Sequence, residues 1–346
     1  MKSWKRWNLA LAIGLVAAGA VVPAFNLLID PYSVLGTAEW MRQGYNVNER
    51  FRKVEHLRTH PGEHDSYILG SSIMGLFPPE VAQEVHPDGH WYNLAFLAGT
   101  PPEALRALKF LKSQGQPIRE VMFGIDMFAF RKLDGTGSEP WKREHPMVTG
   151  ESWTKWRTSQ ILASTFMDGL EKVGHNFNKQ PRLSFDVDGT GRYFLLNWDR
   201  EIAADHAAFI ARQITGKHNG DGSGPKRSSV AFIQERFDEL GELKQWLDAN
   251  GVKAHFWVNP MHRKNMATLT EASIDDFRRR VTAAVGEVPD YSSRKDFCDN
   301  DDLFYEWKHF RPVAAAQIIR EVLARDDGMM IPPGHEIDSP KLLSQR

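Results

Sequence analysis

The segment from Asn8 to Ile29 constrains this chain more than any other, because it runs for 22 residues without a charged side chain. As a helix rising about 1.5 Å per residue, it would span roughly the ~30 Å hydrocarbon thickness of a bilayer. Lys2, Lys5 and Arg6 precede it, and positive charge of this kind stays on the cytoplasmic side. The sequence therefore predicts a single-pass anchor in the inner (cytoplasmic) membrane, with the body facing the periplasm or the cell exterior.

A cleaved signal peptide is the competing interpretation of this segment. Its small residues Ala17, Ala18 and Ala20 are typical of a cleavage region. The apolar run continues past them to Ile29, which is long for the apolar core of a signal peptide. We therefore expect an uncleaved anchor.

The charge balance and the single cysteine exclude several classes of protein. The chain has 43 basic and 44 acidic residues, whereas a nucleic-acid-binding domain needs a basic face, so we expect no nucleic-acid partner. Cys298 is the only cysteine, which rules out an intramolecular disulfide. We interpret it as a small buried residue rather than a nucleophile. Because the sequence contains no glycine-rich phosphate-binding loop and no metal-binding cysteine cluster, we expect no cofactor.

Strand-like and helix-like patterns alternate beyond residue 65. This alternation predicts an α/β fold, a three-layer αβα sandwich around a mostly parallel sheet. The expected strands are residues 66–69, 91–96, 118–125, 252–258 and 288–291. The expected helices that accompany them are residues 79–85, 101–114, 230–250, 273–285 and 312–325.

The alternation also suggests how the chain is organised. We expect a membrane anchor at 1–29, a juxtamembrane connector at 30–64, the α/β domain at 65–326 and a tail at 327–346. Two short helices are expected in the connector, at 38–43 and 48–59. An insertion at 131–225 interrupts the domain, with helices expected near 153–173 and 199–216 and a flexible stretch at 220–225.

Polar and small residues follow the predicted strands, at the sheet edge where parallel α/β proteins gather their reactive groups. Ser72 lies on the Gly-Ser-Ser turn after the first strand. The loop after the second strand contains Ala98 and Gly99, whose backbone N–H groups can stabilise an oxyanion. His309 precedes the last helix, and Glu306 lies three residues before it, a spacing that lets a carboxylate orient the imidazole.

The order of these blocks resembles the SGNH (GDSL-like) hydrolase superfamily, and within it the membrane-anchored branch of alginate O-acetylation and teichoic-acid D-alanyl transfer proteins. The resemblance covers residues 65–130 and 228–325, and the anchor followed by Asp-Pro-Tyr. It implies that Ser72 is the nucleophile, and that Glu306 and His309 match the acid and base of the family's Asp-x-x-His block. Ala98 or Gly99 matches the oxyanion glycine; the sequence does not distinguish them.

Three residues depart from the family's pattern. Ser71 stands where the nucleophile block has an aspartate, and Glu306 is one methylene longer than the family's aspartate. Asp126 stands at the asparagine position, where an ionised carboxylate would repel an oxyanion. We expect Asp126 to bind a neighbouring backbone group or a substrate hydroxyl instead.

Two function classes follow from this pattern. The first is an O-acyltransferase or esterase that acts on O-acyl groups of a cell-surface or secreted polysaccharide, with a membrane-bound acyl-donor protein as a partner. The second is a non-catalytic glycan-binding or scaffold subunit with the same fold, an alternative that the substitutions at Asp126 and Glu306 motivate.

Other polar and aromatic clusters have structural interpretations. His56, His60 and His64 share a spacing of four, but Pro61-Gly62 breaks the helix that would align them, so we expect no metal there. We interpret the motif Asp186-Val187-Asp188-Gly189 as a turn rather than a calcium loop. His262 and Arg263 follow the fourth strand and are equally consistent with the site and with an exposed loop. The insertion's aromatic residues are expected mainly to pack it against the sheet, with sugar stacking as the alternative; they are Trp141, Trp153, Trp156, Tyr193, Phe194 and Trp198.

Overall fold

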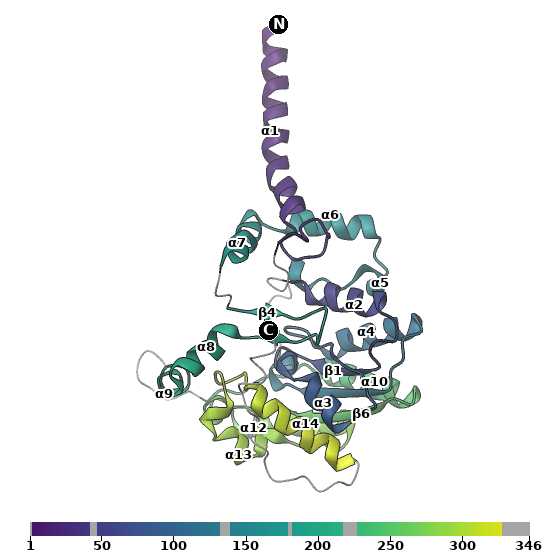
Figure 1. Cartoon of the computed structure of the whole chain (residues 1–346), viewed down its shortest axis with the longest axis vertical. Helices are drawn as coiled ribbons and strands as arrows, with labels where there is room; N and C mark the ends of the chain where they lie inside the picture. The colour runs from purple at the N-terminus through teal and green to yellow at the C-terminus, as the bar shows by residue number, and fades with distance from the viewer. Residues whose placement is uncertain (1, 42–46, 132–138, 179–181, 217–226, 327–346) are drawn as a thin grey trace.

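The computed structural model describes residues 2–41, 47–131, 139–178, 182–216 and 227–326. Four strands form the central sheet in this part of the chain, in the order β2-β1-β3-β6, and every neighbouring pair is parallel. Their bounds are β1 Ser66–Gly70, β2 Trp91–Asn93, β3 Glu120–Ile125 and β6 Lys253–Val258. The prediction of an α/β fold with a mostly parallel sheet is confirmed (Figure 1).

Helices cover both faces of this sheet. Successive strand residues point to opposite faces, so Tyr67 and Leu69 join one core while Ile68 joins the other. The first core is closed by α4 Pro101–Ser113, α10 Gln234–Ala249 and α12 Glu271–Val285. The second core is closed by α3 Pro79–Val85 and α14 Pro312–Asp326.

The strand expected at 288–291 does not form. Asp290 makes one isolated bridge to Val258, and the chain then turns into the 3₁₀ helix η5 Tyr291–Ser293. The Asp290 carboxylate accepts hydrogen bonds from the backbone N–H and the hydroxyl of Ser292, which favours this turn over an extended ladder.

The described residues of the insertion form short helices and one small hairpin. Its elements are η3 Pro140–Lys142, α5 Pro146–Thr149, α6 Trp153–Ala163, α7 Phe166–Phe177, β4 Ser184–Phe185, β5 Tyr193–Phe194, α8 Leu196–Ala204, α9 His206–Ile210 and the π-helical turn Ala211–Thr215. The single helix expected at 153–173 is therefore two. Thr165 interrupts it, because its side chain and that of Asp168 form a capping box that starts a new helix. The helix expected at 199–216 is likewise interrupted, where Asp205 caps α9.

The N-terminal region consists of α1 Lys2–Ile29 and α2 Glu49–Thr59. The α1 helix projects from the body, and it is long and apolar enough to cross a membrane (Figure 1). Asn48 caps α2 by accepting a hydrogen bond from the Phe51 N–H, as the expected helix at 48–59 requires. Residues 38–41 are not helical, and residues 42–43 lie outside the described residues.

The remaining short elements are η1 Met74–Leu76, η2 Met127–Phe130, α11 Arg263–Met266, α13 Lys295–Cys298 and η6 Asp301–Leu303. The expected flexible stretch at 220–225 and the tail at 327–346 also lie outside the described residues.

Candidate active site

Ser72, His309 and Glu306 form a hydrogen-bonded chain. The Ser72 Oγ lies 3.0 Å from His309 Nε2, and His309 Nδ1 lies 2.6 Å from Glu306 Oε1. Burial raises the pKa of Glu306, but hydrogen bonds from His309 outweigh it and hold this pKa below its usual value. The ionised carboxylate can only accept, so the proton sits on Nδ1 and the lone pair of Nε2 faces the serine. This is the arrangement that a serine nucleophile needs.

A tight loop holds the acid and the base together. Phe304 and Phe310 make an antiparallel bridge, and the Tyr305 N–H donates to the His309 carbonyl at 2.9 Å. Glu306 Oε1 also accepts the backbone N–H of His309 at 2.9 Å. The longer side chain of Glu306 therefore reaches the imidazole from within the same loop.

The serine turn depends on Gly70, the last residue of β1. Its φ of 135° is a backbone conformation that favours glycine. A methyl group placed on it would lie 2.6 Å from Met74 Cγ and 3.0 Å from the Gly124 carbonyl oxygen. The chain turns here into η1, which leaves Ser72 at the carboxyl edge of the sheet.

Tyr193 of the insertion also supports this turn, and the sequence did not single it out for this role. Its hydroxyl donates to the Ser72 carbonyl oxygen at 2.7 Å, and its ring packs where a side chain on Gly75 would lie. Tyr193 is buried. No spacing rule links residue 193 to residue 72, so only the fold brings them together.

Ala98 and Gly99 differ in whether their backbone N–H group is free to bind an oxyanion. The Gly99 N–H donates to the Phe96 carbonyl at 2.8 Å, so it is already engaged. A methyl group on Gly99 would lie 2.4 Å from the Gly70 carbonyl oxygen, so glycine lets this loop approach the serine turn. Ala98 lines the cavity beside Ser72 and has a φ of 52°, a strained conformation for alanine. Because the Gly99 N–H is engaged and Ala98 lines the cavity, Ala98 is the better candidate for the oxyanion amide.

A buried polar network on α2 holds the same loop from behind. Glu49 accepts the Leu97 N–H, and Lys53 donates to the Ala95 carbonyl. Lys53 and Glu49 pair at 3.2 Å, and burial lowers the pKa of Lys53. The network is buried, so removing either charge would leave the other uncompensated. The segment expected to be a polar connector thus supports the site.

Arg50 adds a second support to this loop. Its Nη2 donates to the Leu97 carbonyl at 2.9 Å, and its Nε pairs with Glu103 Oε1 at 2.5 Å. Glu103 also forms the capping box with Thr100 at the start of α4. The loop between β2 and α4 is therefore bound on both sides.

The Asp126 carboxylate accepts two hydrogen bonds from neighbouring residues. Its Oδ2 accepts the Ser71 hydroxyl at 2.9 Å, and its Oδ1 accepts the Phe128 N–H at 3.0 Å. Burial raises the pKa of Asp126 despite these hydrogen bonds. The expected bond to a neighbouring backbone group is present. Because Ser71 donates to Asp126, its hydroxyl is not directed at His309.

A cavity of about 480 Å³ lies in front of Ser72 and His309. Its lining residues are Ser71, Ser72, Ile73, Ala98, Thr100, Asp126, Phe128, Ala129, Arg131, Lys308 and His309. Two of them are cations that flank one aromatic ring: the Arg131 guanidinium lies 4.3 Å and the Lys308 ammonium 5.1 Å from the Phe128 centroid. The cavity can therefore hold a small acyl group with an anionic group nearby.

His262 and Arg263 do not line this cavity. His262 is buried and lies 2.9 Å from Asp301 Oδ1, and Arg263 bonds the Asp299 carbonyl and Asp301. They instead tie the loop after β6 to η6.

The Asp186 motif is a turn, as expected. The Asp186 carboxylate accepts the N–H and the hydroxyl of Thr190, which closes the loop between β4 and β5. Among the insertion's aromatic residues, Trp156 is buried and stacks on Phe51 of α2 at 4.7 Å, and Trp198 packs on Tyr305 at 5.6 Å. These two contacts are packing contacts.

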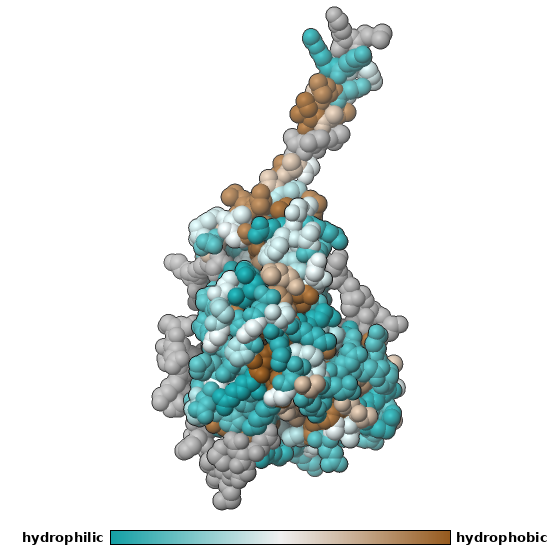
Figure 2. All heavy atoms as spheres, turned by 90° about the vertical axis from the view of Figure 1, so that its right-hand side faces the viewer, coloured by the Kyte–Doolittle hydropathy of each residue, from teal (hydrophilic) through white to brown (hydrophobic). Residues whose placement is uncertain are grey.

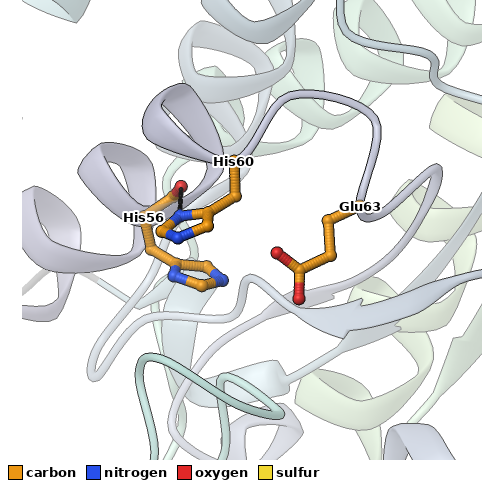
Figure 3. Close-up of side chains that lie close together, drawn as sticks. All are labelled: His56, His60 and Glu63. Carbon is orange, nitrogen blue, oxygen red and sulfur yellow. Dashed lines mark hydrogen bonds between the residues drawn. The ribbon is translucent and has the colours of Figure 1, made fainter.

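His56, His60 and Glu63 lie close together at the end of α2 (Figure 3). Both ring nitrogens of His56 are buried without a hydrogen-bond partner, and burial lowers the pKa of His56. The rings of His56 and His60 stack, with centroids 4.5 Å apart and planes 28° apart. A metal ion lies in the plane of each imidazole that binds it, about 2.0–2.1 Å from the nitrogen. The two rings stack in this arrangement, which is typical of aromatic packing, and the absence of a metal here stays a prediction.

Comparisons with known proteins do not show a family. No protein-family model matches this chain, and no curated protein sequence matches it. Among solved structures, a GDSL-like lipase from Bacteroides thetaiotaomicron is similar over 80% of this chain and 97% of the lipase, at 11% identity and a TM-score of 0.33. A similarity at that TM-score carries no argument about this protein.

Proposed function

We propose that this protein is a membrane-anchored, extracytoplasmic serine O-acyltransferase or esterase that acts on O-acyl groups of a cell-surface glycan. The observation that carries the proposal is the chain from Ser72 through His309 to Glu306 at the wall of a cavity. The anchor supports the extracytoplasmic location, because Lys2, Lys5 and Arg6 precede the apolar helix.

In the proposed reaction, Ser72 Oγ attacks the acyl carbonyl carbon while its proton moves to His309 Nε2. Glu306 stabilises the imidazolium that results. The negative charge that develops on the carbonyl oxygen faces the N–H groups of Ala98 and Ser72. When the tetrahedral intermediate collapses, the bond to the leaving alcohol breaks, and His309 returns the proton to that alcohol.

The acyl-enzyme is then released by a second attack. Either water or a sugar hydroxyl gives its proton to His309 and attacks the ester carbon. The bond between that carbon and Ser72 Oγ then breaks, and His309 returns the proton to Ser72 Oγ. Water gives hydrolysis, and a sugar hydroxyl gives acyl transfer. Attachment to a membrane favours transfer, because it would keep the site beside a membrane-bound acyl donor.

A non-catalytic glycan-binding role is the alternative that the sequence raised. It rested on Glu306 and Asp126, which depart from the family's pattern. Glu306 contacts His309, and Asp126 is engaged with Ser71 and Phe128 rather than directed at the site of the oxyanion. The geometry therefore favours the catalytic proposal.

Covalent labelling tests the proposal. A fluorophosphonate should label the full-length protein in detergent, and Ser72→Ala should abolish the labelling. Ser71→Ala is the matched control, since Ser71 is adjacent and lines the same cavity but donates to Asp126. Absence of labelling in the folded wild-type protein would refute the catalytic proposal, and labelling retained in Ser72→Ala would place the nucleophile elsewhere.

A further inference from the structure

The exposed apolar side chains of this protein are concentrated at one place on its body. Outside α1, seven large apolar side chains are exposed among the described residues, and five of them lie on α6 or α7. We call these five the α6–α7 patch: Leu162, Phe166, Met167, Leu170 and Phe177. Monomeric soluble proteins rarely leave such residues clustered without a function. The remaining two, Trp40 and Met147, are on the connector and on α5.

The patch adjoins the point where α1 enters the body. Figure 1 shows α6 and α7 on either side of the base of α1, and Figure 2 shows apolar side chains gathered there. The rings of Phe25 and Phe166 lie 4.8 Å apart. Gly169 of α7 faces Phe25 so closely that a methyl group on it would lie 2.4 Å from that ring.

Hydrogen bonds fix the patch to the anchor. The Asn26 amide of α1 donates to the Ser164 carbonyl, between α6 and α7, at 2.6 Å. Lys172 of α7 is buried and donates to the Asp30 carbonyl at 2.6 Å and to the Ser33 hydroxyl at 2.7 Å. The patch therefore cannot move independently of the last turns of α1.

The length of α1 sets the depth of the patch. The uncharged run begins at Asn8, and about 20 residues at ~1.5 Å each cross a hydrocarbon core of ~30 Å, so the core ends near Leu27. Leu27 and Leu28 are exposed, so the body leaves one face of this turn uncovered, while Asn26 and Ile29 on its other face are buried. Phe166 contacts Phe25, two residues before that level. The patch thus lies at the boundary between the acyl chains and the headgroups.

We infer that the α6–α7 patch inserts into the outer surface of the bilayer beside α1 and gives the body a second attachment to lipid. Amphipathic helices bury their apolar face roughly 5–10 Å into this boundary. Lipid fits better than a protein partner, because the patch packs against the last turns of α1, at the level of the headgroups. Two attachments would restrict how the body tilts over the membrane. The inference rests on the membrane anchoring in the proposed function, and not on its chemistry.

The test measures the depth of spin labels in the full-length protein reconstituted in phosphatidylcholine nanodiscs. Cys298 is buried and is the only cysteine, so Cys298→Ser provides a background for single cysteines. Met167→Cys and Phe177→Cys report on the patch. Ile13→Cys on α1 is the lipid control, and Thr282→Cys on α12 is the water control. Collision with oxygen reports lipid, and collision with a water-soluble nickel chelate reports water.

Labels at 167 and 177 should lose nickel collisions and gain oxygen collisions relative to the label at 282. If the labels at 167 and 177 collide with nickel as often as the label at 282, the inference is overturned. If the label at 13 still reports lipid in that experiment, the anchor itself stands. Shielding from both reagents would show a protein covering the patch and would overturn lipid as the occupant. A water-exposed label at 13 would refute the anchor itself, and the inference with it.

A second measurement avoids the cysteine substitutions. A phospholipid with a photoreactive group near its headgroup should label peptides from α6 and α7 in the wild-type protein, and not peptides from α12. Labelling confined to α1 would contradict the inference.

Discussion

The hydroxyl of Tyr193 donates a hydrogen bond to the carbonyl oxygen of Ser72, 2.7 Å away. Tyr193 belongs to the insertion, whereas Ser72 follows the first strand of the sheet. The insertion therefore takes part in positioning the serine, in addition to packing on the domain.

Tyr193→Phe should lower kcat several-fold. The change leaves a carbonyl oxygen on the serine turn without its donor, which costs about 1–3 kcal/mol where the group is buried. Tyr92→Phe is the matched control, because the Tyr92 hydroxyl donates to the Val187 carbonyl at 2.7 Å, also in a buried position. Melting temperature should fall in both variants, and kcat for p-nitrophenyl acetate only in Tyr193→Phe. Equal kcat in the two variants would contradict a positioning role.

Glu306→Gln should reduce kcat by about 10²–10⁴-fold with little change in the melting temperature, because an amide can stabilise neither the imidazolium nor the correct tautomer. Asp301→Asn is a suitable control, since it alters a similar carboxylate–imidazole contact, to His262, outside the cavity. The measurement is kcat of both variants on p-nitrophenyl acetate, which should fall only in Glu306→Gln. An unchanged kcat in Glu306→Gln would show that Glu306 is not the orienting acid.

Gly99→Ala should impair the protein, whereas Ala98→Gly should be tolerated. A methyl group on Gly99 would meet the Gly70 carbonyl oxygen, so the loop must shift and kcat should fall. Ala98 has a φ of 52°, so glycine there relieves strain at no cost in contacts to the loop and should keep the protein within about 1 kcal/mol of wild-type stability. Activity and unfolding curves of the two variants test this contrast. A loss of activity in Ala98→Gly without a loss in Gly99→Ala would contradict this prediction.

Arg131→Gln should affect anionic substrates selectively. Arg131 lines the cavity beside Lys308, and both cations face Phe128. We expect KM to rise for a p-nitrophenyl ester whose acyl group ends in a carboxylate, and to stay unchanged for p-nitrophenyl acetate. Arg263→Gln, outside the cavity, should change neither. An equal effect on both esters would argue against recognition of an anionic group.

Stability should decline as the pH falls below about 6.5. Burial lowers the pKa of His56 and His64, so the unfolded chain binds more protons than the folded protein just below the ordinary histidine pKa. The free energy of unfolding therefore falls as the pH falls through this window. Melting temperatures at pH 7.5 and 5.5 should differ less in His56→Gln and His64→Gln than in the wild type. His90→Gln, on an exposed residue, is the control.

Local patterns in the sequence were sufficient to predict the α/β fold, the apolar N-terminal helix and the edge of the sheet where Ser72 lies. Each depends on neighbouring residues: strand periodicity, a 22-residue uncharged run and a turn after a strand. The sequence also placed Glu306 three residues before His309, and this spacing made their contact predictable.

Only the tertiary structure decided the contacts between distant segments. The hydrogen bond from Ser72 to His309 joins residues 237 positions apart, and the bond from Tyr193 to Ser72 joins residues 121 apart. The choice of Ala98 over Gly99 depends on which N–H group the Phe96 carbonyl already engages. The buried pair of Glu49 and Lys53 belongs to a segment that the sequence identified only as a juxtamembrane connector. Polarity reports how well a side chain tolerates water, and only the folded chain determines whether partners replace that water.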